Sequence, residues 1–530
     1  MIAGMQVDSP RSTTQRWLRF LLPSALDFFF ITLLFGLSCG ALGRLLLRDA
    51  DIGWHIRNGQ QILQTHSVPR VDPFSSSMGG KPWFAWEWLY DAVIAAIHHV
   101  FGLNGVVFYT AAIIAATFVV ALYVGLRRGG SLPLTLFLLI LSLGSAAVHF
   151  LARPHVISWL FSVIWFDLLD SAAQSEARDR RLYWLPLIMA LWANLHGGFV
   201  LGFGLLAVYL IAGAIEYFTR PDQRVRIGPW LKHLSLISTL TFAASFLNPY
   251  GYQLHLHVYR YLSDRFLMDR ISEFLSPDFH SPAQQCFAIL LLITFVVLAT
   301  ARRRLPLAQL LLILFAAYAG FYATRNLPSS SLLIALVIAP VLSETIANAG
   351  RNANLRLWLR KLFSGTQSFS ERVGAMERQL HGHLWLVVVF VLGLWACAHH
   401  GRIGSTQFIN AYFDAKRFPV QAVDVIAQRG IHEPVFSLDY WGGYLIYRLY
   451  PETKVVVDDR HDFYGDQFFK DFLRVVLAQP GWDEALNKLH VNWVLMPTES
   501  TLANMLRLSS TWESAYQDET AVLFQRRVAQ

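Results

Sequence analysis

The chain has 530 residues, of which 54% are hydrophobic and only 15% are charged. Soluble globular proteins carry about 25% charged residues, so this composition excludes an ordinary soluble enzyme and a disordered or fibrous protein. The net charge of +8 is uneven: residues 400–530 contain 13 Lys and Arg against 16 Asp and Glu, or −3, and the remainder carries +11. A basic membrane part with an acidic tail fits cytoplasmic Lys/Arg-rich loops and no nucleic-acid partner.

Apolar runs occupy most of the first 399 residues. A spanning helix needs about 20 apolar residues, and eleven runs are candidates: 23–46, 104–125, 132–150, 154–172, 183–196, 197–217, 233–247, 286–301, 305–322, 327–346 and 383–399. The first is too long for the apolar region of a signal peptide, so we expect a retained helix. The three cysteines, Cys39, Cys286 and Cys397, lie in apolar runs and form no disulfide or zinc framework.

Basic residues set the predicted orientation. With the N-terminus in the cytoplasm, where Arg11, Arg16 and Arg19 lie, the inner segments hold 21 Lys and Arg, and the outer segments before residue 400 hold 10. This agrees with the positive-inside rule. It requires that run 83–101, which contains Glu87 and Asp91, be an amphipathic helix at the outer interface rather than a span. Eleven spans then place the C-terminal part outside the cytoplasm, across a bacterial inner membrane.

Two long segments face outward in this topology, 47–103 and 248–285. Stretch 52–64 is predicted as a short helix in the first of them. Residues 400–530 have the composition of a soluble domain. We expect strands at 435–440, 454–460, 491–497 and 521–527, and helices at 417–429, 466–478, 482–490 and 501–509. Alternating strands and helices predict a small α/β domain.

Acidic residues in the first outer segment are the main catalytic candidates. Asp51 follows the first helix, Glu87 lies 36 residues later, and His55 shares a helical face with Asp51. Two carboxylates can divide general-base and positioning roles, and Asp51, His55 and Glu87 together can hold a divalent metal ion. The alternative is that these acids cap helices or pair with arginines.

Cations near the outer helix ends are candidates for binding a phosphate. Arg57, Arg153 and Arg325 can hold the phosphate of a membrane lipid bidentately. His196 precedes two glycines that let a backbone approach a ligand. Snorkelling arginines and a simple helical hairpin are the alternatives.

The tail offers a second candidate site, because two polar clusters follow predicted strands, where α/β sheets commonly bind ligands. The residues are Trp441, Asp458, Asp459, Arg460 and Asp462. An acceptor sugar or a metal is one interpretation, and a charged turn with ion pairs is the other. The chain contains no P-loop, G-x-S-x-G or H-E-x-x-H motif, which disfavours ATPases, serine hydrolases and zincins.

This layout resembles the GT-C superfamily of integral-membrane glycosyltransferases, which includes protein O-mannosyltransferases, oligosaccharyltransferases and lipid A aminoarabinose transferases. Asp51 stands where that family has an acid after its first helix. Gly80-Lys81-Pro82-Trp83 stands where many members have an acidic-Lys-Pro segment; the acid is replaced by Gly80, and Glu87 is the nearest acid downstream. The resemblance implies a polytopic bundle, a soluble outer domain and lipid-phosphate-linked sugar donors.

Several motifs are also similar to those of bacterial membrane proteins without an assigned function. They are D-x-x-W-H-x-R-x-G (Asp51 to Gly59), D-P-F-S (Asp72 to Ser75), E-W-L (Glu87 to Leu89), W-x-N-x-H-G-G (Trp192 to Gly198), Y-W-G-G-Y (Tyr440 to Tyr444) and D-x-R-x-D-x-Y-G (Asp458 to Gly465). They cover nearly the whole chain but carry no function with them.

Together, the residues and the resemblance predict an enzyme that moves a sugar from a polyprenyl-phosphate donor to an extracytoplasmic glycan, lipid or protein. Asp51 would act as general base or organise a metal ion, with Glu87 and His55 assisting. Arg57, Arg153, Arg325 and His196 would hold the donor phosphate. The alternatives are a polysaccharide polymerase or ligase that uses a pyrophosphate-linked donor, and a non-catalytic carrier or scaffold for lipid-linked saccharides.

Overall fold

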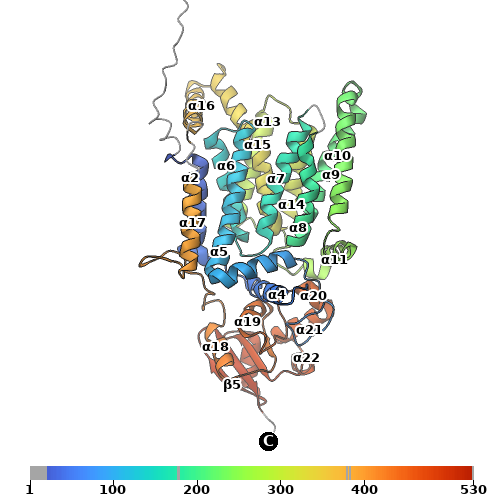
Figure 1. Ribbon diagram of the computed structural model, residues 1–530, viewed down its shortest axis with the longest axis vertical. Coiled ribbons are helices and arrows are strands. Elements are labelled where there is room, and N and C mark those ends of the chain that lie inside the picture. Colours follow the sequence, from blue (N-terminus) through green and yellow to red (C-terminus); the bar gives the residue numbers. More distant parts are fainter. Residues whose placement is uncertain (1–20, 176–178, 378–379, 381–383, 528–530) are drawn as a thin grey trace, which may run out of the picture.

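The computed structural model describes residues 21–175, 179–377, 380 and 384–527; the basic residues Arg11, Arg16 and Arg19 lie outside these ranges. A bundle of upright helices forms the upper part of Figure 1. Its helices, which include one over each of the eleven apolar runs, are α2 (Ala25–Ser38), α3 (Gly40–Leu45), α5 (Trp88–Arg127), α6 (Leu132–Ala146), α7 (His155–Ala173), α8 (Trp184–Leu195), α9 (Val200–Thr219), α10 (Arg224–Ala244), α13 (Pro282–Thr300), α14 (Leu307–Tyr322), α15 (Leu327–Arg351) and α17 (Leu384–Ala398).

Six helical segments of the described chain are long and apolar enough to cross a membrane: Trp88–Arg127, Leu132–His149, His155–Ala173, Gly197–Thr219, Pro282–Thr300 and Thr324–Arg351. Three shorter helices, α2, α14 and α17, are also apolar. The short 3₁₀ turns η1 (Ala147–His149), η3 (Gly197–Phe199) and η5 (Thr324–Asn326) join bundle helices, as do η2 (Arg180–Tyr183) and η4 (Pro221–Gln223). The chain is thus a mostly helical membrane protein, and the number of eleven spans stays a prediction.

Helix α5 changes direction at Gly102, whose φ of 60° and ψ of −158° are not helical. An L-residue with a side chain rarely adopts such a backbone conformation, so glycine permits the break. The first part of α5 lies across the lower end of the bundle, and the second part runs up through it (Figure 1). Residues 88–101 therefore form a helix across the bundle end, as run 83–101 predicts.

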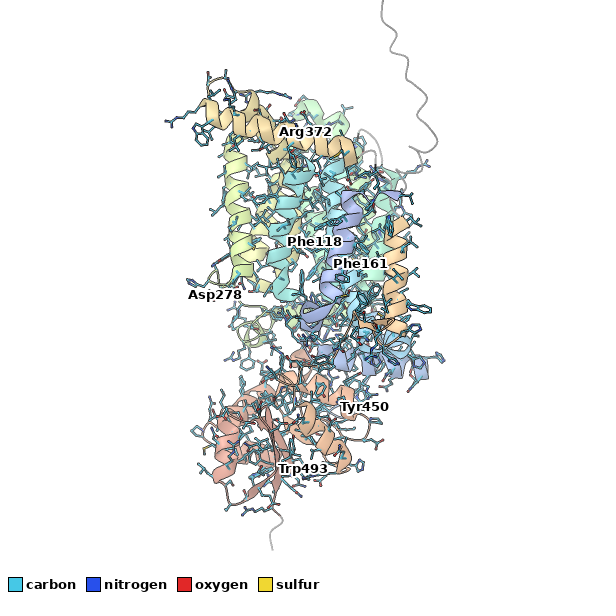
Figure 2. The ribbon with its side chains drawn as sticks, turned by 90° about the vertical axis from the view of Figure 1, so that its left-hand side faces the viewer. Phe118, Phe161, Asp278, Arg372, Tyr450 and Trp493 are labelled. Carbon is cyan, nitrogen blue, oxygen red and sulfur yellow. The ribbon has the colours of Figure 1, made fainter. Side chains whose placement is uncertain are left out.

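Further helices lie at the two ends of the bundle. At the lower end are α4 (Asp51–Thr65), α11 (Tyr252–Ser263) and the single turn α12 (Arg265–Met268), which come from the two long outer segments. At the opposite end lies α16 (Leu357–Glu377), seen across the top of Figure 2 at the label for Arg372. The predicted helix at 52–64 corresponds to α4.

The tail contains a small mixed sheet of order β3-β4-β6-β5. Strand β3 (Val435–Ser437) is parallel to β4 (Trp493–Pro497), and β6 (Ala521–Arg526) is antiparallel to both β4 and β5 (Trp512–Gln517). A separate two-stranded ribbon, β1 (Arg402–Ile403) and β2 (Thr406–Gln407), precedes it. The helices of the tail are α18 (Val420–Gln428), α19 (Asp439–Leu449), α20 (His461–Tyr464), α21 (Asp466–Val476), α22 (Trp482–Lys488) and α23 (Thr501–Leu508).

Three parts of the tail differ from the predicted pattern. Residues 454–460 form only isolated bridges, because Val455 pairs with Val435 on one side and with Ser75 of the outer segment on the other. Stretch 441–444 lies inside helix α19 rather than in a turn after a strand. Only Trp512 of strand β5 is buried, so the strand has no apolar alternation and the sequence pattern does not reveal it.

The tail packs closely onto the outer segment through α19 and α4 (Figure 1). A Cβ at Gly53 would lie 2.1 Å from the carbonyl oxygen of Gly443, and a Cβ at Gly443 would lie 2.3 Å from that of Ala50. The Ser76 amide donates to the Val455 carbonyl at 2.8 Å. Buried Arg460 pairs with Asp72 at 2.9 Å. The tail is thereby held in one position against the bundle.

Replacing Gly443 by alanine tests this packing. Alanine normally stabilises a helix by about 0.5–1 kcal/mol relative to glycine, but here its Cβ would overlap the Ala50 backbone. We expect a net loss of about 1–3 kcal/mol, measured as a lower midpoint of thermal unfolding and faster protease cleavage of the tail. The control is Gly365→Ala in α16, where no atom lies within 4 Å of the added Cβ. Equal effects of both substitutions would contradict a docking role for Gly443.

Candidate active site

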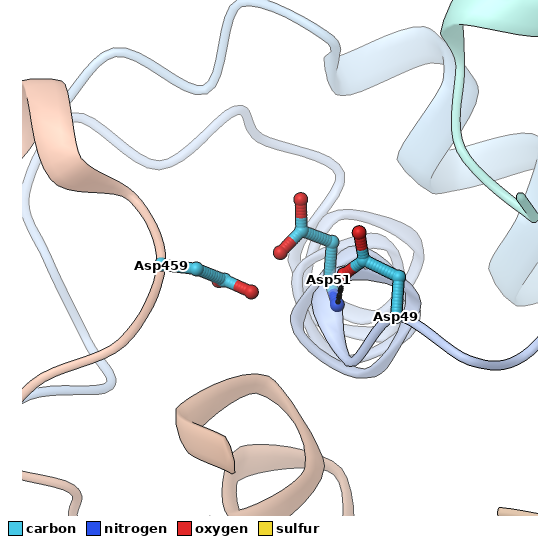
Figure 3. Close-up of side chains that lie close together, drawn as sticks. All are labelled: Asp49, Asp51 and Asp459. Atoms are coloured by element: carbon cyan, nitrogen blue, oxygen red, sulfur yellow. Dashed lines mark hydrogen bonds between the residues drawn. The ribbon is translucent and has the colours of Figure 1, made fainter. Parts of the chain in front are cut away.

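Three aspartates meet where the tail touches the start of α4. One carboxylate oxygen from each of Asp49, Asp51 and Asp459 lies within 4.8 Å of the other two. Asp49 and Asp51 stand at the N-terminus of α4, where the helix dipole favours negative charge, and Asp49 accepts a hydrogen bond from the Asp51 amide at 3.0 Å. Asp459 points at them from the tail (Figure 3). We refer to these three residues as the acidic cluster.

The acidic cluster is short of positive charge. Arg153 contacts Asp51 at 2.7 Å and Asp49 at 3.2 Å. The buried Oδ1 atoms of Asp51 and Asp459 have no hydrogen-bond partner among the described residues. Burial raises the pKa of Asp459 well above its usual range, and the neighbouring Asp51 charge raises it further. Burial raises the pKa of Asp51 in the same direction. The chemistry of this donor set therefore fits a hard divalent cation, which prefers carboxylate oxygens.

Glu273 links Arg153 and Arg325 beside the cluster. Its two carboxylate oxygens lie 3.7 Å from Arg153 Nη1 and 3.5 Å from Arg325 Nη1. Burial opposes ionisation of Glu273, but the charges of Arg325 and Arg153 outweigh it and hold the pKa of this carboxyl below its usual range. The Arg325 amide donates to the Glu273 carbonyl at 2.9 Å. The outer segment 248–285 thus supplies an acid that holds the two arginines together.

His55 lies in a separate buried group with Glu87 and Asp91. Its Nδ1 is 2.6 Å from Asp91 Oδ1, and Asn58 donates to the other Asp91 oxygen at 2.6 Å. Burial lowers the pKa of His55 to about 3, so the ring is neutral at pH 7. A neutral ring that donates from Nδ1 to Asp91 keeps a lone pair on Nε2, which faces Glu87 at 3.9 Å.

His196 faces the other oxygen of Glu87, at 3.6 Å from its Nε2. The Gly198 amide donates to His196 Nδ1 at 3.0 Å, and Ser158 Oγ lies 2.7 Å from the same atom. Because Nδ1 accepts, the proton of the neutral ring is on Nε2 and points toward Glu87. Burial raises the pKa of Glu87 well above its usual range, and the charge of Asp91 adds to this. Glu87 therefore lies between the Nε2 atoms of His55 and His196.

The structure groups the predicted residues differently from the sequence-based metal set. Asp51 lies with Asp49 and Asp459, whereas His55 and Glu87 belong to the neighbouring group around Asp91. Arg153 and Arg325 converge on Glu273 beside the acidic cluster.

Arg57 lies elsewhere. It donates to the Tyr447 carbonyl of α19 at 2.9 and 2.5 Å. Its third described hydrogen bond goes to Gln60 of α4 at 3.1 Å, so none of the three points into the acidic cluster.

The tail candidates fall into two groups. Asp459 joins the acidic cluster. The others form contacts within the tail or with the segments that it packs against: Trp441 is 1% exposed and donates to the Arg417 carbonyl, Asp458 and Arg460 form a buried pair, and Asp462 pairs with His257 of α11 at 3.1 Å. Burial opposes ionisation of Asp458, but Arg460 outweighs it and lowers the pKa of this carboxyl.

Sequence reasoning missed Asp91 as a partner of His55, and Glu273 and Ser158 altogether. Asp91 and His55 lie 36 residues apart on different helices, so no local spacing joins them. A buried acid on the interface helix was the available signal, because such a group requires a polar partner.

Comparison by sequence gives no relative: no protein-family model matches the chain, and no curated protein matches it.

Comparison by structure finds similar proteins. The archaeal oligosaccharyltransferase AglB from Archaeoglobus fulgidus, in complex with an inhibitory peptide and a dolichol-phosphate, matches 92% of this chain and 70% of its own at 12% identity, with a TM-score of 0.60. The same transferase tethered to an acceptor peptide matches 90% of this chain and 69% of its own at 11% identity, with a TM-score of 0.54. ArnT from Cupriavidus metallidurans matches 94% of this chain and 96% of its own at 12% identity, with a TM-score of 0.48. The chain has the fold of the GT-C membrane glycosyltransferases.

Proposed function

We propose that this chain transfers a glycosyl group from a polyprenyl-phosphate-linked donor to an extracytoplasmic acceptor at the acidic cluster. The observation that carries the proposal is the meeting of three carboxylates with Arg153 at the end of the bundle that the tail covers. The AglB structure that shares this fold holds a dolichol-phosphate and a peptide. That pair supports a lipid phosphate on one side of the reaction and a separate acceptor on the other.

The reaction forms a bond between the acceptor oxygen and the anomeric carbon of the sugar. The bond from that carbon to the phosphate oxygen breaks, and the lipid phosphate leaves with the electron pair as an anion. Arg153 and Arg325 stabilise this anion, because guanidinium groups match phosphate oxygens in geometry and charge. In the resting structure Glu273 holds the same two arginines, so the phosphate has to replace or share that contact.

Glu87 accepts the proton of the acceptor hydroxyl. Burial raises its pKa well above the usual range, so this carboxylate holds a proton more readily than an exposed glutamate, which suits a general base. Asp91 keeps His55 with its Nε2 lone pair toward Glu87, and His196 offers an Nε2 proton to the opposite oxygen. Asp91 is therefore a positioning residue that acts through His55.

Asp49, Asp51 and Asp459 would hold a divalent cation such as Mg²⁺ or Mn²⁺. The fit rests on the two buried carboxylate oxygens that lack a partner. When bound, the cation would offset negative charge around the leaving phosphate. Asp459 makes the tail part of the site, since it is the one member of the acidic cluster that does not come from the start of α4.

Substitution of the cluster tests the activity. We expect Asp51→Asn and Asp459→Asn each to lower release of lipid phosphate from a panel of polyprenyl-phosphate sugars by about 10²-fold or more, with unchanged thermal unfolding. Asp471→Asn is the matched control, because Asp471 is a tail carboxylate that contacts only Arg474 and Gln467 among the described side chains. Full turnover by Asp51→Asn would refute the proposed chemistry.

Metal binding has its own readout. We expect purified protein to bind Mn²⁺, detected by electron paramagnetic resonance without substrate, and Asp459→Asn to weaken binding by about 10- to 100-fold. Asp471→Asn should bind Mn²⁺ as the unaltered protein does. Equal binding by the unaltered protein and Asp459→Asn would remove Asp459 from the ligand set and leave the transferase proposal standing on activity alone.

A double-mutant cycle tests the role of Asp91. Asp91→Asn should lower kcat by about 10-fold or more with little change in KM or in Mn²⁺ binding, because it loosens the orientation of His55. In the His55→Gln background the same substitution should have almost no further effect on kcat. Additive losses would show that Asp91 acts independently of His55, and a lower unfolding temperature would indicate a structural role.

A further inference from the structure

A cavity of about 260 Å³ lies at the other end of the bundle from the acidic cluster. It is lined by the end of α5, by α7, α14 and α15, and by the loop between α13 and α14. Helix α5 begins beside α4 and ends at the opposite side of the bundle (Figure 1). The charged residues that line the cavity are Arg127, Arg128, Arg303 and Glu344. The predicted orientation places this end at the cytoplasmic leaflet.

Two of these arginines are already neutralised. Arg127 pairs with Asp167 and donates to Ser171 at 3.1 Å. Arg128 pairs with Asp170, and its side chain is only 9% exposed. Asp170 also accepts from Gln309, at 3.1 and 3.2 Å from its two oxygens. These buried contacts form the fixed wall of the cavity.

Arg303 and Glu344 differ from the other two charges. Neither has a hydrogen bond or an ion pair with any residue that the structure describes, and they do not reach each other within the 4.0 Å of an ion pair. They lie on different elements, the α13–α14 loop and α15. The buried Nε of Arg128 also has no acceptor in the described chain. The cavity therefore offers one unpaired positive charge, one unpaired negative charge and a buried N–H.

We propose that this cavity binds a zwitterionic phosphate group of the phosphoethanolamine type. The phosphate would contact Arg303 and the Nε of Arg128, because guanidinium N–H groups bind phosphate oxygens well. The primary ammonium would contact Glu344. Arg303 and Glu344 are both exposed, and such a ligand would pair with both charges at once, whereas a purely anionic phosphate would face the like charge of Glu344. The site is separate from the transferase site and does not depend on the proposed function.

A lipid headgroup and a free phosphoethanolamine share this chemistry. A lipid would enter from the leaflet beside the cavity, and a free molecule from solution. Both probes can be added to purified full-length protein in detergent, without any sugar donor. A ligand that binds only the folded state stabilises it by RT ln(1 + [L]/Kd), so the rise in unfolding temperature at a fixed ligand concentration reports its affinity. Short-chain phosphatidylethanolamine, phosphatidylglycerol and phosphatidylcholine then separate the contributions of ammonium and phosphate.

We expect phosphatidylethanolamine to bind about tenfold more tightly than phosphatidylglycerol or phosphatidylcholine, since only it carries an ammonium with N–H donors. Glu344→Gln should abolish this preference while phosphatidylglycerol still binds. Arg303→Gln should weaken binding of phosphatidylethanolamine and of phosphatidylglycerol about tenfold. Because neither side chain has a partner in the described structure, both variants should fold normally. Arg304→Gln, a neighbouring loop arginine outside the cavity lining, is the matched control and should bind as the unaltered protein does.

The outcomes separate cleanly. Stabilisation by free phosphoethanolamine that is reduced in Arg303→Gln supports the site and identifies a soluble ligand. Stabilisation by the lipid alone supports the site and identifies a headgroup. The same preference for phosphatidylethanolamine in Glu344→Gln as in the unaltered protein would overturn the proposal, as would an equal response of all variants to every lipid.

Discussion

The close approach of α19 to the start of α4 is the contact on which the candidate site depends. Two backbones can approach this closely only where side chains are absent, and Gly53 and Gly443 meet that requirement. The contact brings the loop at 458–460 over the N-terminus of α4. The carboxylate of Asp459 then reaches Asp51. A tail held at a greater distance would leave the first outer segment with two aspartates and no third.

The negative charge of the acidic cluster explains why a proton or a cation is needed there. Three carboxylates of the acidic cluster lie together, and Glu273 lies beside them, while Arg153 and Arg325 supply two positive charges. Burying unpaired carboxylates costs free energy, and the raised pKa values of Asp51 and Asp459 express that cost. A proton or a cation can compensate it. The proposed divalent cation would contact the same oxygens that otherwise retain a proton.

The sequence predicts the bundle well because apolar runs carry most of the information. Each run has a helix, and the charged residues of run 83–101 correctly mark a segment that lies across the bundle end. The tail is harder to predict from the sequence, because its strands pair with segments that are distant in the chain. Val455 looks like part of a strand, but it bridges Val435 and Ser75, from two segments far apart in the chain. Helix α19 contains two glycines that indicate a turn, and only tertiary packing explains them: Gly443 lies against the Ala50 backbone, and Gly442 lies against Val457 and Asp458.

The candidate site shows the same difference between what is local in the sequence and what depends on tertiary contacts. Asp51, His55 and Glu87 can be picked out as polar residues in an outer segment, but their grouping depends on tertiary contacts. Asp459 joins Asp51 through tail docking, and Asp91 joins His55 through packing of α4 on α5. The sequence therefore identifies candidate residues more reliably than it identifies which of them act together.

Helix α4 fixes the spacing between the acidic cluster and the group around Glu87, which are the two parts of the proposed active site. Asp51 and His55 lie four residues apart, about 6 Å along the axis, so one rigid helix spaces the acidic cluster from the group around Glu87. Gly59 fixes the helix against α5, because a Cβ there would lie 1.8 Å from the Asp91 carbonyl oxygen. The helix thus cannot slide without breaking the contact of Asp91 with His55. An acceptor hydroxyl that reaches Glu87 would then be held at a constant distance from a phosphate at Arg153, which is the geometric requirement of a direct transfer.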